Sequence, residues 1–194
     1  MIVFARHGET APNREGRILG RAADPELTGE GRDQAERLAG VLAREDPVAV
    51  VTSPLLRARE TADVIARACG LPVQVDERLV EIDWGTWEGR PMTGIAPAEL
   101  TRLRADAGTA PEGESLAALG ARVGEFCTEV LDGDGLVVAV THVSPIKAAV
   151  AWALGIPDES AFRMFVALAS VTRVDRRSRG PILLSFNETA HLQD

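Results

Sequence analysis

The sequence predicts an α/β fold of three layers (α/β/α), in which helices cover both faces of a mostly parallel central sheet. Residues 2–5, 48–51 and 136–140 are short apolar runs rich in β-forming residues, which is the pattern of buried strands. Amphipathic helical patterns lie between them. Two further extended runs, residues 162–175 and 181–187, flank a turn and predict a C-terminal antiparallel hairpin that completes the sheet.

Length and composition fit a single globular domain. The 194 residues can enclose a substantial core, so we expect one domain over residues 1–194, with a small helical cap inserted at about residues 90–112. Because the formal net charge is −8, the composition argues against a general nucleic-acid or polyanion binder. Any anion site must then be a local positive pocket on a negative body.

The sequence carries no signal for a membrane. No apolar run approaches the ~20 residues that a membrane span needs, and the chain opens on a strand rather than on a charged and apolar leader. We therefore expect a cytoplasmic protein, monomeric or homodimeric, with no membrane and no nucleic-acid partner. Cys69 and Cys127 each fall on an amphipathic helical pattern, which favours free packed thiols over a disulfide or a metal pair.

The first predicted strand passes without a linker into Arg6-His7-Gly8-Glu9-Thr10. Residues 11–27 are rich in Pro, Gly, Arg and Asp without periodicity, and they predict a long ordered loop of the kind that carries function. Thr28 is the candidate N-cap of the next helix, whose apolar residues recur at helical spacing until Pro47 stops it.

The second strand ends at Thr52-Ser53-Pro54, where the sequence predicts a helix with Ser53 as N-cap and Pro54 at the first helical position. That helix should run to Gly70, and residues 71–75 should form a short extended segment. Residues 78–89 are irregular, aromatic and punctuated by glycine.

The second half of the chain repeats the alternation of helix and strand. We expect a short helix within residues 95–105, a loop over residues 108–113, and a helix whose apolar side runs from Leu116 to Val130. The strand 136–140 ends in Thr141-His142, and a further helix leads from there to Gly155.

Three predicted parallel strands carry polar groups at their carboxyl ends, where ligands bind in α/β sheets. The first ends in Arg6-His7, the second in Ser53 with Arg57 one turn along the helix, and the third in Thr141-His142. Two imidazoles, two guanidinium groups and the N–H groups of two helix N-termini, at Ser53 and near Val143, are what a phosphoryl dianion requires. The alternatives are a solvated charged turn after the first strand and a buried ion network without a ligand.

Several short motifs of the chain resemble those of a known family, the histidine phosphatase (phosphoglycerate mutase-like) superfamily, in its short phosphatase branch. The motifs that carry the resemblance, in chain order, are Arg6-His7-Gly8-Glu9-Thr10, Ser53-Pro54-Leu55-Leu56-Arg57-Ala58, Glu81 ahead of Gly85-Thr86-Trp87-Glu88-Gly89, Gly113-Glu114-Ser115 and Thr141-His142.

The resemblance implies catalytic roles for five residues. His7 would be the nucleophile that carries a phosphohistidine, and it must be neutral to attack phosphorus. Arg6 and Arg57 would hold the phosphoryl oxygens, and His142 would clamp them from the opposite side. Glu81 would protonate the leaving alkoxide and then activate water, although Asp83 and Glu88 lie close to it in the sequence.

The resemblance also implies substrate contacts. Asn13 matches an amide donor to the phosphoryl group, and the backbone N–H of Val143 is a further donor. Substrate choice should depend on residues 14–24, where we expect Gly20 and Arg21 to contact the substrate, on the segment 84–94, and on the helix at 95–105. No metal and no cofactor is implied. A zinc site from His7, His142 and a carboxylate is the alternative, without any repeated metal-ligand spacing in the sequence.

The length of the cap bears on the reaction. Mutases of the superfamily resemble one another in carrying a long insertion before the Gly-Glu-Ser motif, whereas only residues 90–112 lie there in this chain. A short cap holds a phosphorylated product less well and admits water, so we expect a phosphomonoesterase acting on a small-molecule phosphate ester. A phosphoglycerate mutase-type transferase and a non-catalytic phosphate-binding module are the two alternatives.

Overall fold

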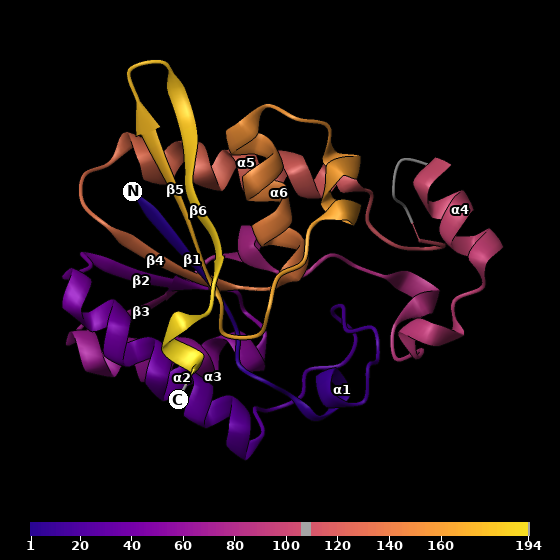
Figure 1. Ribbon diagram of the computed structural model, residues 1–194, viewed down its shortest axis with the longest axis horizontal. Helices are drawn as coiled ribbons and strands as arrows, with labels where there is room; N and C mark the ends of the chain where they lie inside the picture. The colour runs from indigo at the N-terminus through magenta and orange to yellow at the C-terminus, as the bar shows by residue number, and fades with distance from the viewer. Residues whose placement is uncertain (106–109, 194) are drawn as a thin grey trace.

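A six-stranded sheet of the order β3-β2-β4-β1-β5-β6 forms the centre of the computed structural model, which describes residues 1–105 and 110–193 (Figure 1). The four strands β3, β2, β4 and β1 are parallel to one another, and β5 and β6 follow antiparallel to β1 and to each other. The strands are β1 (Ile2–Arg6), β2 (Ala49–Thr52), β3 (Val73–Val75), β4 (Val137–Thr141), β5 (Val171–Arg177) and β6 (Gly180–Glu188).

Helices cover both faces of this sheet, which confirms the predicted three-layer fold. Figure 1 shows α2 (Gly29–Leu42) and α3 (Leu56–Cys69) on one side of the strands, and α5 (Leu116–Asp132) and α6 (Val143–Leu154) on the other. Two smaller helices, α1 (Ala11–Arg14) and α4 (Pro97–Ala105), lie away from the sheet. Short 3-10 segments complete the chain at Ala43–Glu45, Glu77–Leu79, Gly85–Trp87, Met92–Gly94, Asp158–Arg163 and Ala190–Leu192.

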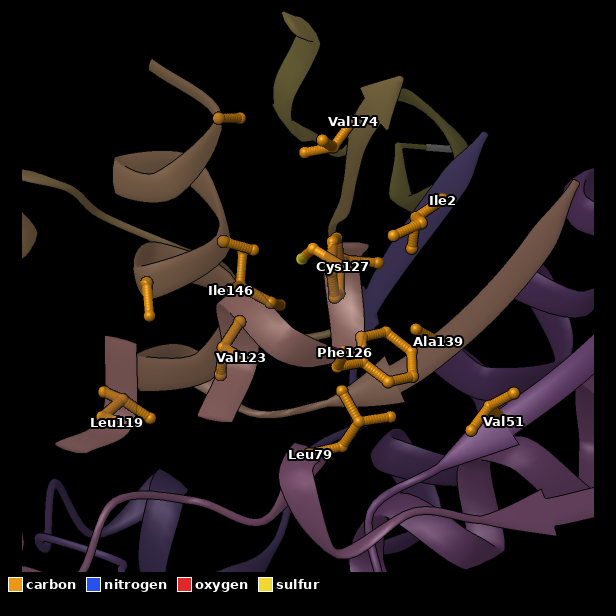
Figure 2. Packing of buried hydrophobic residues seen from close by; sticks show 14 of the residues in the cluster. Ile2, Val51, Leu79, Leu119, Val123, Phe126, Cys127, Ala139, Ile146 and Val174 are labelled. Atoms are coloured by element: carbon orange, nitrogen blue, oxygen red, sulfur yellow. The ribbon is translucent and has the colours of Figure 1, made fainter. Parts of the chain in front are cut away.

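The larger core lies between the sheet and the helix pair α5 and α6. Its members come from positions three or four apart along α5, because that spacing places side chains on one face of a helix. Phe126 stands against Phe4 of β1 with ring centroids 6.2 Å apart. Figure 2 shows Phe126 and Cys127 from α5 and Ile146 from α6 facing Ile2 and Ala139 of the sheet.

A second core fills the opposite face. The small residues of α2 and α3 let both helices approach the sheet closely, as the side chains of Ala39, Ala58 and Ala62 are almost fully buried against Val3 and Val140. Both cysteines are free thiols, as predicted. Among the residues described here, no helix is both long enough and apolar enough to cross a membrane.

Two local predictions were wrong, and each has a physical cause. Ser53 is not an N-cap: α3 begins at Leu56 with Leu55 in the cap position, because the Ser53 hydroxyl bonds to His142 instead. The extended run predicted over residues 162–175 is a strand only from Val171. Before it, Ala169 adopts a left-handed φ of 51°, and its backbone N–H bonds to the His7 carbonyl 3.2 Å away.

The segment predicted to form a cap, residues 90–112, contributes short elements to a small separate cluster of buried residues. Ile18, Trp87, Ile95 and Ala110 are buried together there, with α4 next to them. Residues 106–109, which include part of the loop expected over residues 108–113, lie outside the described residues. This cluster links the loop 11–27 to the cap, since Ile18 donates to the Arg90 carbonyl at 2.9 Å.

Candidate active site

The register of the parallel strands brings the candidate residues to one edge of the sheet. Arg6 at the end of β1 pairs with Thr141 at the end of β4, and Thr52 of β2 pairs with Val140. The backbone N–H of His7 donates to the Thr141 carbonyl at 3.0 Å. His7, Ser53 and His142 each follow directly on one of these strand ends, so residues far apart in sequence lie side by side.

The two imidazole rings face one another at short range. Their centroids are 5.1 Å apart and their planes are inclined by 59°. The side chain of His7 is 2 % exposed and that of His142 is fully buried. Burial, followed by the charges of Arg57 and Arg6, holds the pKa of His7 well below its usual range. The ring of His7 is therefore neutral at pH 7.

A hydrogen bond fixes which nitrogen of His7 is free. Its Nδ1 lies 2.7 Å from the carbonyl oxygen of Gly8, and a carbonyl oxygen can only accept. Nδ1 therefore carries the proton, and Nε2 keeps an unshared electron pair. A neutral imidazole with a free Nε2 is the form that can attack an electrophile.

Glycine permits the loop after β1 to pass close to helix α2. A methyl group at Gly8 would lie 2.3 Å from the carbonyl oxygen of Gly31, so only glycine fits there without moving one of the two segments. The Gly8 N–H donates to the hydroxyl of Thr61, which in turn donates to the Arg57 carbonyl at 2.8 Å. These contacts hold the His7 loop against α2 and α3.

Arg6 and Arg57 place buried positive charge beside the two rings. Arg6 Nη1 donates to the Val166 carbonyl at 2.8 Å, and Arg57 Nη2 donates to the Gly20 carbonyl at 2.9 Å. Burial lowers the pKa of Arg6 to about 10, so its guanidinium stays charged at pH 7. Within the described parts of the chain, three buried side-chain nitrogens have no partner: Arg6 Nε, Arg57 Nε and His142 Nδ1.

The Ser53 hydroxyl is the hydrogen-bond partner of His142. The Ser53 oxygen accepts a hydrogen bond from the Leu55 N–H at 3.3 Å and lies 2.7 Å from His142 Nε2. A hydroxyl oxygen has two lone pairs, so Ser53 can donate to Nε2 or accept from it. Burial, then the charge of Arg57, lowers the pKa of His142, so the ring is neutral. When the Ser53 hydroxyl donates to Nε2, the ring proton resides on Nδ1, the unpartnered atom.

Glu81 is the acidic side chain that lies beside this cluster. It is 5 % exposed, and its Oε1 accepts from the backbone N–H groups of Ile82 at 2.8 Å and Ser144 at 3.2 Å. No ion pair joins it to Arg6 or Arg57 in the chain as described, so these three residues do not form the closed ion network of the alternative. The acidic partner of Arg57 is the half-exposed Asp24, whose Oδ1 lies 3.9 Å from Arg57 Nη1. Asp83 and Glu88 are used elsewhere: each accepts from backbone N–H groups of nearby turns.

Two arginines donate hydrogen bonds to the backbone carbonyl of Glu81. Arg21 Nε donates to the Glu81 carbonyl at 2.7 Å, and Arg122 Nη2 reaches the same oxygen at 3.4 Å. Glu114 joins the two arginines, with distances of 2.7 Å to Arg21 Nη2 and 2.8 Å to Arg122 Nε. The structure therefore places Arg21 in the support of Glu81, while the carbonyl of Gly20 holds Arg57.

A cavity of about 280 Å³ opens from the cluster. Asn13 and Val143 belong to its wall, whereas Gly20 and Arg21 do not. The Asn13 Oδ1 is occupied by the backbone N–H and hydroxyl of Thr10, which leaves its Nδ2 group for a ligand. The remaining wall comprises Arg6, His7, Arg17, Ile18, Leu19, Arg57, Glu81, Trp84, Trp87, Met92, Leu100, Leu116, Leu119, Ser144, Lys147, Ala148, Asp158, Ala161 and Phe162.

Sequence reasoning missed several residues of the site. Ser53 was assigned to a helix cap, and Arg122 stands on an amphipathic helix where nothing in the pattern marks it. Glu114 belongs to the Gly-Glu-Ser motif, so that motif was a usable signal for its contact with Arg21. In the described part of the chain, no three histidine, cysteine or acidic side chains gather closely enough to hold a metal ion.

Comparison with known proteins places this arrangement in a family. The profile of the histidine phosphatase superfamily (branch 1) matches residues 2–189. The chain belongs to the histidine phosphatase superfamily. A relative from Yersinia enterocolitica, named "Probable phosphoglycerate mutase GpmB", is 33 % identical over 98 % of this chain and 94 % of its own length.

Solved structures of two phosphatases superimpose on nearly the whole chain. The mycobacterial glucosyl-3-phosphoglycerate phosphatase in complex with VO3 has a TM-score of 0.88 and 33 % identity, over 97 % of this chain and 98 % of the other. A phosphoserine phosphatase from Entamoeba histolytica in complex with phosphoserine has a TM-score of 0.88 and 27 % identity, over 99 % of this chain and 98 % of the other. The superfamily thus includes relatives named as phosphatases and as mutases.

Proposed function

We propose that this protein is a metal-independent phosphomonoesterase that hydrolyses a small phosphorylated metabolite through a phosphohistidine on His7. The observation that carries the proposal is a surplus of buried positive charge around a neutral imidazole. Arg6 and Arg57 bring two charges, and Glu81, even when it is ionised, offsets only one of them without pairing to either. Asp24 lies 3.9 Å from Arg57 Nη1, but its side chain is 44 % exposed and outside the cavity wall. Unpaired buried charge is strongly unfavourable, so this pocket favours an anion.

The unpartnered nitrogens give that anion its shape. Arg6 Nε and Arg57 Nε are two buried N–H donors without a partner, and His142 Nδ1 is a third in the tautomer that carries its proton there. A phosphoryl group has three equatorial oxygens that take up charge in the transition state. We assign one or more of these donors to those oxygens, with the Asn13 amide and the Val143 N–H as further donors from the cavity wall.

The first chemical step transfers the phosphoryl group to the enzyme. The Nε2 lone pair of His7 attacks phosphorus, a nitrogen–phosphorus bond forms, and the bond between phosphorus and the ester oxygen breaks. Glu81, in its carboxylic acid form, gives its proton to the departing alkoxide, which leaves as the alcohol. The backbone contacts of Glu81 to Ile82 and Ser144 hold the carboxyl in place for this transfer.

The second step releases inorganic phosphate. Water attacks phosphorus, the carboxylate of Glu81 takes up the water proton, and the nitrogen–phosphorus bond breaks, which returns the electron pair to His7. Transfer to a second substrate hydroxyl would give a mutase instead. The cavity of about 280 Å³ is small, and the cap is short, so we favour water as the acceptor.

The test uses p-nitrophenyl phosphate with EDTA present, comparing wild type with His7→Ala. A matched control is His191→Gln, which removes the imidazole that bonds to the Ala169 carbonyl near the C-terminus. We expect metal-free turnover in wild type and control, none above background in His7→Ala, and an acid-labile phosphoenzyme in the first two alone. Turnover that survives His7→Ala, or that needs an added metal, would refute the proposal.

Two further measurements address the alternatives. Incubation with 3-phosphoglycerate and a bisphosphate primer, followed by separation of the 2- and 3-isomers, detects a mutase. Binding of phosphate without turnover of any ester would instead identify a binding module. We expect release of inorganic phosphate to exceed isomer formation.

A further inference from the structure

One charged residue of the cavity wall has no part in the chemistry described so far. Lys147 is the only lysine in the sequence. Of the four cationic side chains in the wall, Arg6 and Arg57 flank the two imidazoles, and Arg17 pairs with Glu15 at 2.7 Å. Lys147 has neither a hydrogen bond nor an ion pair with any other residue that the structure describes.

The position of Lys147 makes this lack of a partner costly. The side chain is half-buried, and burial lowers its pKa against the opposing attraction of Glu81. It also lies in the second turn of α6, near the positive end of the helix dipole, where a cation gains nothing from the helix. Helix stability therefore does not explain a lysine here.

The fold directs Lys147 toward the leaving-group side of the site. It is four residues beyond Val143 on α6, which places both on one face of the helix about 6 Å apart along its axis. The residue next to Val143, Ser144, donates its N–H to Glu81, the proposed proton donor to the leaving group. A leaving group attached to phosphorus at His7 extends into the cavity whose wall includes both Glu81 and Lys147.

The rest of the outer wall is mainly apolar. Trp84 and Trp87 are stacked with ring centroids 6.3 Å apart, and Phe162 and Leu100 join the same cluster. Besides Lys147, the charged groups of this outer part are Arg17 and Asp158. Asp158 lies over Gly120 of α5 and forms no ion pair with Lys147 within the described structure. A leaving group with many hydroxyls would find few hydrogen-bond partners here.

We propose that Lys147 binds a carboxylate on the leaving group, and that the substrate is a phosphomonoester with a compact apolar body and one carboxylate close to the ester. This inference rests on the proposed phosphatase function and specifies its substrate class. The carboxylate supplies the direct ion pair that Lys147 lacks among the described residues, and the apolar body packs against the wall formed by Trp84, Trp87 and Phe162. Lys147 is thus a specificity residue rather than a participant in phosphoryl transfer.

The test compares pairs of aryl phosphates that differ only in charge. The pairs are 3-carboxyphenyl phosphate with 3-carbamoylphenyl phosphate, and the two corresponding 4-substituted esters. Each is assayed by phosphate release with wild type, Lys147→Met, which keeps length without charge, and Lys147→Arg, which keeps charge. We expect wild type to favour the carboxylate in at least one pair by about ten-fold in kcat/KM, as for a hydrogen bond between charged groups.

The variants decide whether Lys147 is the cause. Lys147→Met should reduce that ratio to about one, and Lys147→Arg should retain part of it. A wild-type ratio near one in both pairs, or a preference that survives in Lys147→Met, overturns the inference. Because the readout is a ratio within each variant, a general loss of active enzyme cancels.

A second readout does not depend on turnover. Reductive methylation with labelled formaldehyde marks one side chain, because the chain has a single lysine, and its NMR signal titrates with the pKa of Lys147. Adding 3-carboxybenzylphosphonate should raise that pKa more than adding 3-carbamoylbenzylphosphonate. Equal shifts would contradict the inference. A failure of the proposed phosphatase function can be told apart from a failure of this inference. In the first case His7→Ala would not reduce hydrolysis of either ester, whereas in the second case hydrolysis depends on His7 but shows no preference for the carboxylate.

Discussion

The hydroxyl of Ser53 should support catalysis through its hydrogen bond to His142, and Ser53→Ala tests this prediction. In the structure this hydroxyl lies 2.7 Å from His142 Nε2, and if it donates to that atom the ring proton is held on Nδ1. Without this hydroxyl, the neutral ring can carry its proton on Nε2. Nδ1 then has a lone pair instead of an N–H group and cannot donate a hydrogen bond to a phosphoryl oxygen. The substitution therefore weakens one charge-assisted hydrogen bond in the transition state.

The size of the effect follows from that single bond. Hydrogen bonds to charged groups contribute about 1.5–3 kcal/mol, which corresponds to roughly 10- to 150-fold in rate. Because the ring can still adopt the correct tautomer part of the time, we expect kcat to fall about 10- to 100-fold, less than in His142→Ala. KM should change little, since the donor acts mainly on charge that develops in the transition state.

Steady-state turnover of p-nitrophenyl phosphate gives kcat, and nitrogen-detected NMR of labelled histidine reports the tautomer of His142. Ser170→Ala is a matched control: its hydroxyl is also in a buried residue and donates to the Ala167 carbonyl rather than to either ring. We expect the control to retain kcat within about two-fold. If Ser53→Ala retains full kcat, or His142 keeps its proton on Nδ1 in that variant, the reasoning about the tautomer is wrong.

Three further predictions follow from the site. Gly8→Ala should lower the activity and reduce the free energy of unfolding by about 1–3 kcal/mol, because its methyl group meets Gly31. Gly29→Ala, where the methyl group has open space, should change neither. Chemical denaturation of the two variants measures their stability, and turnover of p-nitrophenyl phosphate measures their activity. Glu114→Gln should slow alkyl phosphates more than p-nitrophenyl phosphate, because a good leaving group needs less help from the proton donor; equal slowing would contradict a role in holding Glu81. Since the pKa of His7 is depressed in the fold, the unfolded chain binds more protons below about pH 6.5, so stability should fall from pH 7 to 5, and His7→Gln should flatten that slope in urea denaturation.

The sequence alone was enough to predict the strands and helices that position the site. The apolar runs of strands and the periodicity of helices are local signals, and parallel strands bring their carboxyl ends to one edge wherever they pair. Arg6, His7, Arg57 and His142 could therefore be assigned to one pocket before any coordinates were known. The chemical roles proposed for them came from the resemblance of their motifs to a known superfamily.

Tertiary structure decided what each polar group bonds to. Ser53 has the local sequence of a helix cap, yet a buried imidazole from another strand takes its hydroxyl. Arg21 has the pattern of a loop charge, yet it lies against the Glu81 carbonyl and Glu114. Such choices depend on which partners long-range packing brings within about 3 Å, a distance that the spacing of residues along a chain does not encode. The lack of an ion-pair partner for Lys147 is likewise a tertiary property, because only the assembled cavity shows that no described residue pairs with it.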